Sequence, residues 1–323
     1  MRKAALLAAA LVGCTVATTA AAQPYPAKPV RILVPYTAGG PADILVRAMG
    51  QKLTETWGQQ VVVENRPGAN EIIAAEAAAK SPADGYTFLL ASDAVFTLNQ
   101  HLYSKVPYDP VKDFLPVTKL VTANLMLVAR PDFPASTVSE LIDYARRNPG
   151  KINYGSVGAG GVNHLAMSWF NNINGLKMEH VPYKGLVQAL QDMAAGRVDV
   201  MFAVIGGALP YLTSGKLKGL AVSGKTRQTA IPTVPTFAEA GYPNFDASFY
   251  FGIAAPAGTP AEIATKFAVD ASRIVNTAEF REKYLSNLGF EPVGDTPEQF
   301  AAFLRSDREL AAKKVQVSGA KLD

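Results

Sequence analysis

The chain has only one cysteine, Cys14, and only three histidines, His101, His164 and His180, among its 323 residues. A single cysteine forms no disulfide within the chain, and thiolate metal sites need several. The histidines are far apart in the sequence, and no two have the four-residue spacing of a metal-binding helix. No Gly-x-Ser-x-Gly motif, which carries the nucleophile of many hydrolases, occurs. We therefore predict no metal site, no cofactor and no catalytic centre.

The chain also lacks a basic cluster and a long apolar run. Its 31 Lys and Arg are scattered along the sequence and are nearly balanced by 27 Asp and Glu, which makes nucleic acid an unexpected partner. No segment approaches the run of about 18 apolar residues that spans a bilayer. With 49% hydrophobic and 18% charged residues, the composition is typical of a globular protein with a large core. The length favours two lobes.

The N-terminus resembles an export signal. A positive Met-Arg-Lys start precedes an apolar stretch over residues 4–12, and small residues precede Gln23. We predict that residues 1–22 are a signal peptide cleaved after Ala22, and that the mature protein is periplasmic. A second interpretation stays open, because the Leu-Val-Gly-Cys sequence ending at Cys14 resembles a lipoprotein processing site and would leave that cysteine as a lipid anchor.

A strand, a glycine pair and a helix near the N-terminus predict an anion site. Residues 30–34 are apolar and β-branched, as in a strand buried on both faces. The helix that follows begins at Pro41 and carries Asp43 in its first turn, where the helix dipole favours negative charge. Gly39 and Gly40 allow backbone N–H groups to point outward at the positive helix end. Because this loop has no Lys or Arg, it suits a carboxylate, although an ordinary βα turn is an equal alternative for this motif alone.

The neighbouring segments predict a parallel sheet. The expected strands are 30–34, 60–64 and 87–91, with helices over 41–57 and 71–80. This alternation implies right-handed crossovers, and ligands in such sheets bind beyond the carboxyl ends of the strands. We therefore expect residues 92–97 to share a crevice with residues 36–40.

The same order of strand, glycine-rich loop and helix returns in the second half. A strand at 152–154 leads into four glycines within residues 155–161, and a helix is expected over 162–173. If the two lobes face each other, Ser156, Asn163 and the amides of 160–163 bind one end of an anion. The amides of residues 38–41 then bind the other end.

The remaining segments complete a two-lobed prediction. Capping boxes are expected at Thr137, Thr259 and Thr296, and residues 205–211 are expected to form a glycine-bearing loop. Chain crossings near Asn124 and Ala247 place lobe 1 at residues 26–124 and 250–323, and lobe 2 at 125–249. Tyr36, Phe96, Tyr183 and Phe249 are candidate cleft walls, and all except Tyr36 fit a buried core as well.

Residues 219–226 match the P-loop expression letter for letter. We reject a nucleotide site, because residues 220–223 continue an apolar strand instead of forming a loop around phosphate. Pro232 and Pro235 also follow where the P-loop requires a helix.

Seven blocks, spread over nearly the whole chain, resemble the Bug family of extracytoplasmic solute receptors of tripartite tricarboxylate transporters. They are 25–31 (Tyr-Pro-Ala-Lys-Pro-Val-Arg), 35–40 (Pro-Tyr-Thr-Ala-Gly-Gly) with Asp43, 63–69 (Val-Glu-Asn-Arg-Pro-Gly-Ala), 84–87 (Asp-Gly-Tyr-Thr), 108–114 (Tyr-Asp-Pro-Val-Lys-Asp-Phe), 180–185 (His-Val-Pro-Tyr-Lys-Gly) and 254–260 (Ala-Ala-Pro-Ala-Gly-Thr-Pro). The resemblance implies an α/β fold of the type II periplasmic-binding-protein class, with two lobes, a ligand cleft and hinge strands. It also implies a carboxylate ligand held by backbone amides without catalysis, and membrane subunits of a transporter as partners. We expect a monomer.

From the motifs and the resemblance together we predict a set of ligand-binding residues. They are Tyr36, Ala38, Gly39, Gly40, Pro41, Asp43, Ser92, Ser156, Gly160, Gly161, Val162, Asn163, Tyr183 and Ala203.

The chain departs from the family pattern where selectivity is expected. After the glycine pair the family often has Ser-Thr-Asp, whereas this chain has Pro-Ala-Asp, and after Phe202 the family often has Asp-Asn, whereas this chain has Ala203-Val204. An acid that would bind an amino group is therefore missing. The hypothesis is a ligand whose far end is apolar or aromatic. Two alternatives to transport stay open: a receptor that docks on a membrane sensor kinase, and an exported enzyme on the same scaffold.

Overall fold

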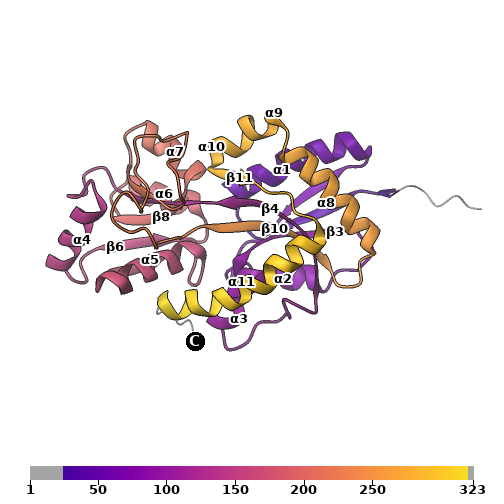
Figure 1. The fold of residues 1–323 in the computed structure, drawn as a ribbon, viewed down its shortest axis with the longest axis horizontal. Coiled ribbons are helices and arrows are strands. Elements are labelled where there is room, and N and C mark those ends of the chain that lie inside the picture. The colour runs from indigo at the N-terminus through magenta and orange to yellow at the C-terminus, as the bar shows by residue number, and fades with distance from the viewer. Residues whose placement is uncertain (1–24, 319–323) are drawn as a thin grey trace, which may run out of the picture.

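Two β-sheets, each covered by helices, form the two lobes of the protein (Figure 1). The computed structural model describes residues 25–318, so the predicted signal peptide and Cys14 lie outside the described residues. Lobe 1 denotes here the part around the six-stranded sheet and lobe 2 the part around the five-stranded sheet. The residue boundaries given above for the lobes stay a prediction.

Lobe 1 is built from the first and the last parts of the described chain. Its sheet has the order β11-β4-β10-β3-β1-β2. Its elements are β1 (Val30–Val34), α1 (Pro41–Trp57), β2 (Val61–Asn65), α2 (Ile72–Ala79), β3 (Thr87–Ser92), η1 (Ala94–Leu98), α3 (Asn99–Leu102), β4 (Phe114–Ala123), β10 (Phe249–Pro256), α8 (Ala261–Val275), α9 (Ala278–Phe280), η2 (Arg281–Leu285), α10 (Ser286–Leu288), β11 (Phe290–Pro292) and α11 (Pro297–Ser318). As predicted, β1 pairs in parallel with β2 and β3. Strand β10 pairs antiparallel with β3 and β4.

Lobe 2 has the strand order β7-β6-β8-β5-β9. Its elements are β5 (Leu125–Ala129), α4 (Val138–Arg147), β6 (Asn153–Ser156), α5 (Val162–Asn174), β7 (Glu179–Pro182), α6 (Leu186–Ala194), β8 (Val200–Val204), α7 (Ile205–Thr213) and β9 (Lys218–Val222). The P-loop-like sequence begins inside β9, a sheet strand, which agrees with its rejection as a nucleotide site.

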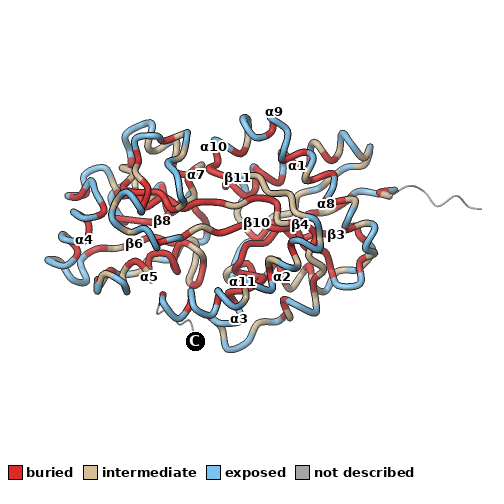
Figure 2. The backbone as a smooth tube through the Cα atoms, in the orientation of Figure 1, coloured by how far each residue is buried: buried red, intermediate tan, exposed pale blue. Residues whose placement is uncertain are grey.

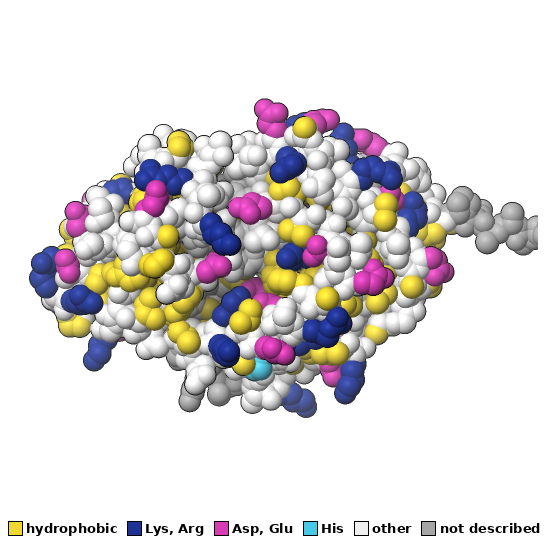
Figure 3. All heavy atoms as spheres, in the orientation of Figure 1, with side chains coloured by type: hydrophobic (Ala, Val, Ile, Leu, Met, Phe, Trp, Pro, Cys, Tyr) yellow, Lys and Arg dark blue, Asp and Glu magenta, His cyan; other side chains and the backbone are white. Residues whose placement is uncertain are grey.

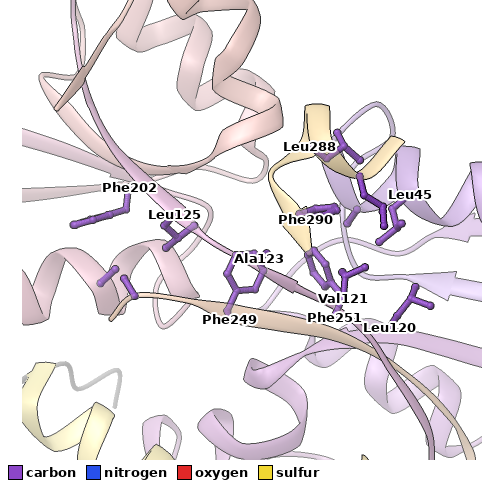
Figure 4. Close-up of a cluster of buried hydrophobic side chains, with 14 of the residues drawn as sticks. Leu45, Leu120, Val121, Ala123, Leu125, Phe202, Phe249, Phe251, Leu288 and Phe290 are labelled. Carbon is purple, nitrogen blue, oxygen red and sulfur yellow. The ribbon is translucent and has the colours of Figure 1, made fainter. Parts of the chain in front are cut away.

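Buried residues run through both lobes (Figure 2), and one large hydrophobic cluster has members in each of them. The chain crosses at Asn124, between β4 and β5, and returns ahead of β10. Around these crossings Leu125, Phe249 and Phe251 belong to the same buried cluster as Phe202 of lobe 2 (Figure 4). Hinge strands of this kind link the lobes by apolar packing as well as by the backbone.

The long helix α11 makes a third link between the lobes (Figure 1). In its first half Phe300 packs with Phe96 in a core cluster of lobe 1. In its second half Ala311 and Val315 pack with Leu165 of α5, in lobe 2. The Asn172 side-chain amide of α5 also donates to a carbonyl near the end of α11.

Two predictions about local structure are wrong. Residues 205–211 are not a loop but most of helix α7, and their glycines allow close packing, because a Cβ on Gly206 would lie 2.5 Å from the Leu288 backbone. Thr259 does not cap α8, since Pro260 is the N-cap residue and the Thr259 hydroxyl donates to the Pro256 carbonyl. The capping boxes at Thr137 and Thr296 are confirmed by the hydrogen bonds that their hydroxyls accept.

Candidate functional site

The N-terminal ends of four helices converge on one cavity between the lobes. Its volume is about 60 Å³. It is lined by Tyr36, Thr37, Gly40, Pro41, Ala42, Val157, Val162, Asn163, Lys184, Gly185, Leu186, Val204, Phe249 and Phe251. These include N-cap or first-turn residues of α1, α5, α6 and α7. Helix N-termini present unpaired N–H groups and positive partial charge, so their convergence favours an anion.

At the end of α1, Asp43 shapes the loop. Its buried carboxylate accepts hydrogen bonds from Gly39 N at 2.9 Å, from Asn65 Nδ2 at 2.8 Å and from Arg47 Nε at 2.9 Å. Burial opposes ionisation, but these donors prevail and lower the pKa of Asp43. The Gly39 N–H is thus engaged inside the protein, while Gly40 and Pro41 line the cavity.

At the N-terminal end of α5, hydrogen bonds with buried side chains fix the glycine-rich loop on the side away from the cavity. Gly160 N donates to His164 Nδ1 at 3.0 Å, with the Gly160 backbone at a φ of 78° that favours glycine. Asn163 Nδ2 donates to the Phe202 carbonyl at 2.6 Å and fixes the helix end on β8. Ser156 Oγ lies 2.6 Å from His180 Nε2 and is fully buried. Ser156 and Gly160 therefore shape the loop, and the open N–H groups belong to the first turn of α5.

The two histidines stack on each other behind this loop. Their ring centroids are 4.1 Å apart, and Tyr154 stacks on His180 at 4.9 Å. Burial, together with the neighbouring His180, lowers the pKa of His164 to about 4. Burial also lowers the pKa of His180. Both rings are therefore neutral at pH 7, and Nδ1 of His164 is free to accept the Gly160 hydrogen bond.

The lobes come into contact beside the cavity at Thr37 and Gly185. A Cβ placed on Gly185 would lie 2.5 Å from Thr37 Oγ1. This distance is shorter than a van der Waals contact, so Thr37 or the backbone at residue 185 would have to move. Gly185 has an extended backbone with φ of −164°, so space and not conformation requires glycine here. This contact joins the β1–α1 loop of lobe 1 to the start of α6 in lobe 2.

A second, wider cavity of about 310 Å³ adjoins the first one, and we call it the outer chamber. Tyr36, Val157 and Lys184 line both cavities. The rest of the outer wall consists of Pro35, Gly68, Ala69, Asn70, Glu71, Tyr103, Gly158, Ala159, Pro182 and Tyr183. Among the described residues that line the inner cavity, the exposed Lys184 is the only charged one. It offers a cation near the helix ends for an anionic ligand.

The structure brings together only part of the predicted set. Tyr36, Gly40, Pro41, Val162 and Asn163 line the inner cavity, and Tyr183 lines the outer chamber. The others lie beside these walls or behind them: Ala38, Gly39, Asp43, Ser92, Ser156, Gly160, Gly161 and Ala203. Among the candidate wall aromatics, Phe249 lines the cavity and Phe96 lies in the core.

Two residues of the predicted set, Ser92 and Ala203, are buried in the protein instead of lining the cavity. The expected shared crevice at residues 92–97 is absent, because Ser92 is buried in β3 and residues 94–98 form the buried helical turn η1. Ala203 packs in the lobe 2 core, whereas its neighbour Val204 lines the cavity. Alternation along a strand places successive side chains on opposite faces, so it could have indicated Val204.

Sequence reasoning also missed Lys184, Gly185 and Leu186. These residues follow β7, the strand that pairs in parallel with β6. The rule that ligands bind beyond strand carboxyl ends applies to β7 as it does to β1, and it could have found them. Ala42, Val157 and Phe251 complete the missed inner lining, whereas Thr37 belongs to the 36–40 segment that was expected to line a crevice.

Residues 25–318 contain no group of three or more metal-ligating side chains placed to hold an ion. No helix within that range is both long enough and apolar enough to cross a membrane.

Two α/β lobes, strands that cross between them and an interlobe cavity at helix N-termini are the features of the two-lobed periplasmic-binding-protein fold. The model of the tripartite tricarboxylate transporter family receptor matches residues 45–317, and the chain belongs to this family.

Relatives agree over almost the whole chain. Protein BugT of Bordetella pertussis is 34% identical over 319 residues, which is 97% of this chain and 98% of BugT. The Rpa4515 structure from R. palustris, solved with adipate, is 33% identical with a TM-score of 0.89, covering 92% of this chain and 100% of that one. MatC from Rhodopseudomonas palustris, solved with bound malate, is 31% identical with a TM-score of 0.84, covering 90% and 100%. The family is thus one of receptors, and both solved neighbours hold a dicarboxylate.

Proposed function

We propose that this protein is a periplasmic receptor that binds a small carboxylate and delivers it to the membrane subunits of a tripartite tricarboxylate transporter. One observation carries the proposal: four helix N-termini converge on a cavity whose one charged lining residue within the described chain is a lysine. The partial charges and free N–H groups there hold a carboxylate without a buried counter-ion. The neighbours' adipate and malate support the ligand class.

The inner cavity favours a ligand with an apolar body. Val162, Leu186, Val204 and two phenylalanines form its walls. The described lining contains no carboxylate to receive an amino group, so aspartate and glutamate are poor ligands in this proposal. Tight binding of either amino acid in a calorimetric titration would contradict this part of the proposal.

We propose binding without catalysis by a monomer. The pair most like a catalytic dyad is Ser156 with His180, but Ser156 Oγ cannot be reached, because this serine has no exposed surface. Ligand binding closes the lobes over the cavity about the crossings near Asn124 and ahead of β10. Small-angle scattering that is unchanged by saturating ligand would contradict closure.

The test is a thermal-shift screen of residues 23–323, unfolded and refolded to remove carried-over ligand, against aliphatic and aromatic mono-, di- and tricarboxylates. A ligand at a hundredfold excess over its dissociation constant adds about 2.7 kcal/mol to the free energy of unfolding. The midpoint should then rise by a few degrees, and a calorimetric titration of the hits gives affinities.

Two matched variants test the helix ends directly. Val162→Asp places a carboxylate in the first turn of α5 at the cavity wall, so carboxylate affinity should fall by about a hundredfold through charge repulsion. Val187→Asp places the same charge in the first turn of α6, but at a side chain that is 41% exposed and lies outside both cavity linings. Affinity should stay unchanged in this control. Equal losses in both variants, or none in Val162→Asp, would contradict the site.

A further inference from the structure

Three consecutive residues other than glycine have left-handed backbone conformations at the edge of the cleft. Ala69, Asn70 and Glu71 have φ values of 46°, 47° and 72°. Such conformations are uncommon outside glycine, and a run of three is strained. Strain of this kind persists only where surrounding contacts hold it, and it concentrates at functional sites.

The Glu71 carboxylate supplies one of those contacts. Its residue is 5% exposed, and its oxygens accept hydrogen bonds from the Tyr36 hydroxyl, from Ser92 Oγ and, at 2.9 Å, from Ser92 N. All three partners donate, which suits an acceptor-only carboxylate. Burial raises the pKa of Glu71, and burial beside Glu71 raises that of Tyr36 well above its usual range, so the phenol remains the donor.

A second contact fixes the middle of the segment. Asn70 Nδ2 donates to Asn99 Oδ1 at 2.7 Å, and Asn99 Nδ2 donates back to the Asn70 carbonyl at 3.0 Å. Asn99 is buried and also donates to the Tyr108 hydroxyl. Two neighbouring residues of the segment, Asn70 and Glu71, are therefore each fixed by hydrogen bonds to other parts of lobe 1.

The held segment forms the lobe 1 wall of the outer chamber. Ala69, Asn70 and Glu71 all line that chamber, opposite residues 157–159 of the lobe 2 glycine-rich loop. A Cβ on Gly161 would lie 3.3 Å from Asn70 Oδ1, so the two lobes approach each other closely at this wall. Tyr36, which Glu71 holds, lines both cavities.

We propose that Glu71 is a positioning residue for the ligand: its buried carboxylate fixes the Tyr36 ring and the left-handed 69–71 segment, and thereby the wall against which lobe 2 closes. This inference rests on the proposed carboxylate-binding function. Glu71 does not itself need to touch the ligand. Its carboxylate fixes the cavity wall in the ligand-free protein, so less conformational entropy is lost when the ligand binds.

The experiment measures ligand affinity and the unfolding midpoint in parallel for the best carboxylate from the screen. Glu71→Gln keeps the shape of the side chain but replaces one carboxylate oxygen, which accepts hydrogen bonds, by an amide NH₂ group, which cannot. Tyr36→Phe removes the hydroxyl that donates to Glu71 and leaves the ring in place. Each should weaken binding by about tenfold, and the double variant should lose less than the product of the two, because both remove the same contact. Thr137→Ala removes a helix cap in lobe 2, away from the cleft, and should lower the midpoint without changing affinity.

Glu71→Gly keeps the inference testable if the glutamine variant folds poorly, because glycine adopts the left-handed conformation freely. Weaker binding in Glu71→Gly with an unfolding midpoint near that of Thr137→Ala supports the proposal. Wild-type affinity in the folded Glu71 variants overturns it and leaves the proposed function standing. A wild-type protein that binds no carboxylate overturns the proposed function itself, and this inference with it.

Discussion

At the scale of single residues, Gly185 determines how closely the lobes meet. Any side chain there would press on Thr37 Oγ1, since the Cβ position lies 2.5 Å from it and 3.2 Å from Thr37 Cγ2. Neither residue is charged, and their contact lies beside the helix ends that line the cavity. In the proposed closure this contact limits how closely the lobes approach, and it supplies no charge that attracts the ligand.

Gly185→Ala should weaken carboxylate binding by about tenfold or more, because the closed state is penalised while the open state is not. The unfolding midpoint without ligand should change little, since the extended backbone at φ of −164° accepts alanine. Adding Thr37→Ala removes both clashing atoms and should restore part of the affinity. A calorimetric titration of the three variants measures the coupling, and additive losses would contradict a steric origin.

At the scale of elements, the sequence predicted those structures whose signals are local. The helix from Pro41 and the parallel strands around it follow from apolar periodicity, and the structure confirms both. Helix α7 was missed because Gly206 and Pro210 normally interrupt helices. Gly206 is required here because the helix packs against Leu288 from a distant part of the chain, and no local pattern shows that contact.

The sequence likewise predicted those parts of the site that have a local pattern and missed those that depend on distant contacts. The helix ends at Pro41 and Val162 were visible as loops with more than one glycine before helices, whereas α6 follows a single glycine, Gly185, and α7 follows Val204. Which N–H groups point into the cavity depends on side-chain partners. The Gly39 and Gly160 amides are engaged by Asp43 and His164, and only the folded loop reveals those hydrogen bonds.

The glycine-rich loop before α5 should make stability depend on pH through His164. Its pKa is about 4 in the folded protein, and the ordinary value is 6.5. Between these two values the unfolded chain binds a proton that the folded protein does not, so stability falls as the pH is lowered through this window. The full difference corresponds to about 3 kcal/mol, an upper estimate because burial is incomplete. His180, whose pKa is also lowered, acts in the same direction.

His164→Asn tests this dependence, because an amide oxygen can accept the Gly160 hydrogen bond but does not titrate. Urea unfolding at pH 7 should give a free energy close to that of the wild type. At pH 4.5 the variant should be the more stable of the two. Parallel pH dependences of the two proteins would show that His164 is not the responsible group.

At the scale of the whole molecule, surface charges are mixed in sign, whereas apolar packing links the two lobes. Acidic and basic side chains are interspersed over the face shown in Figure 3, so this face offers no single-signed field to steer a ligand. One large apolar cluster, by contrast, has members in both lobes. Helix α11 adds contacts to each of them. This shared packing predicts that the two lobes unfold as one unit.

We therefore expect calorimetry of the ligand-free protein to show one transition whose calorimetric and van't Hoff enthalpies agree. Leu125 lies at the crossing between the sheets and is fully buried, so Leu125→Ala should lower the free energy of unfolding by about 2–5 kcal/mol. Leu310, 52% exposed on α11, offers a control whose alanine variant should stay within about 0.5 kcal/mol of the wild type. Two resolved transitions in the wild type, of which Leu125→Ala shifts only one, would mean that the lobes unfold separately and that the crossings act only as tethers.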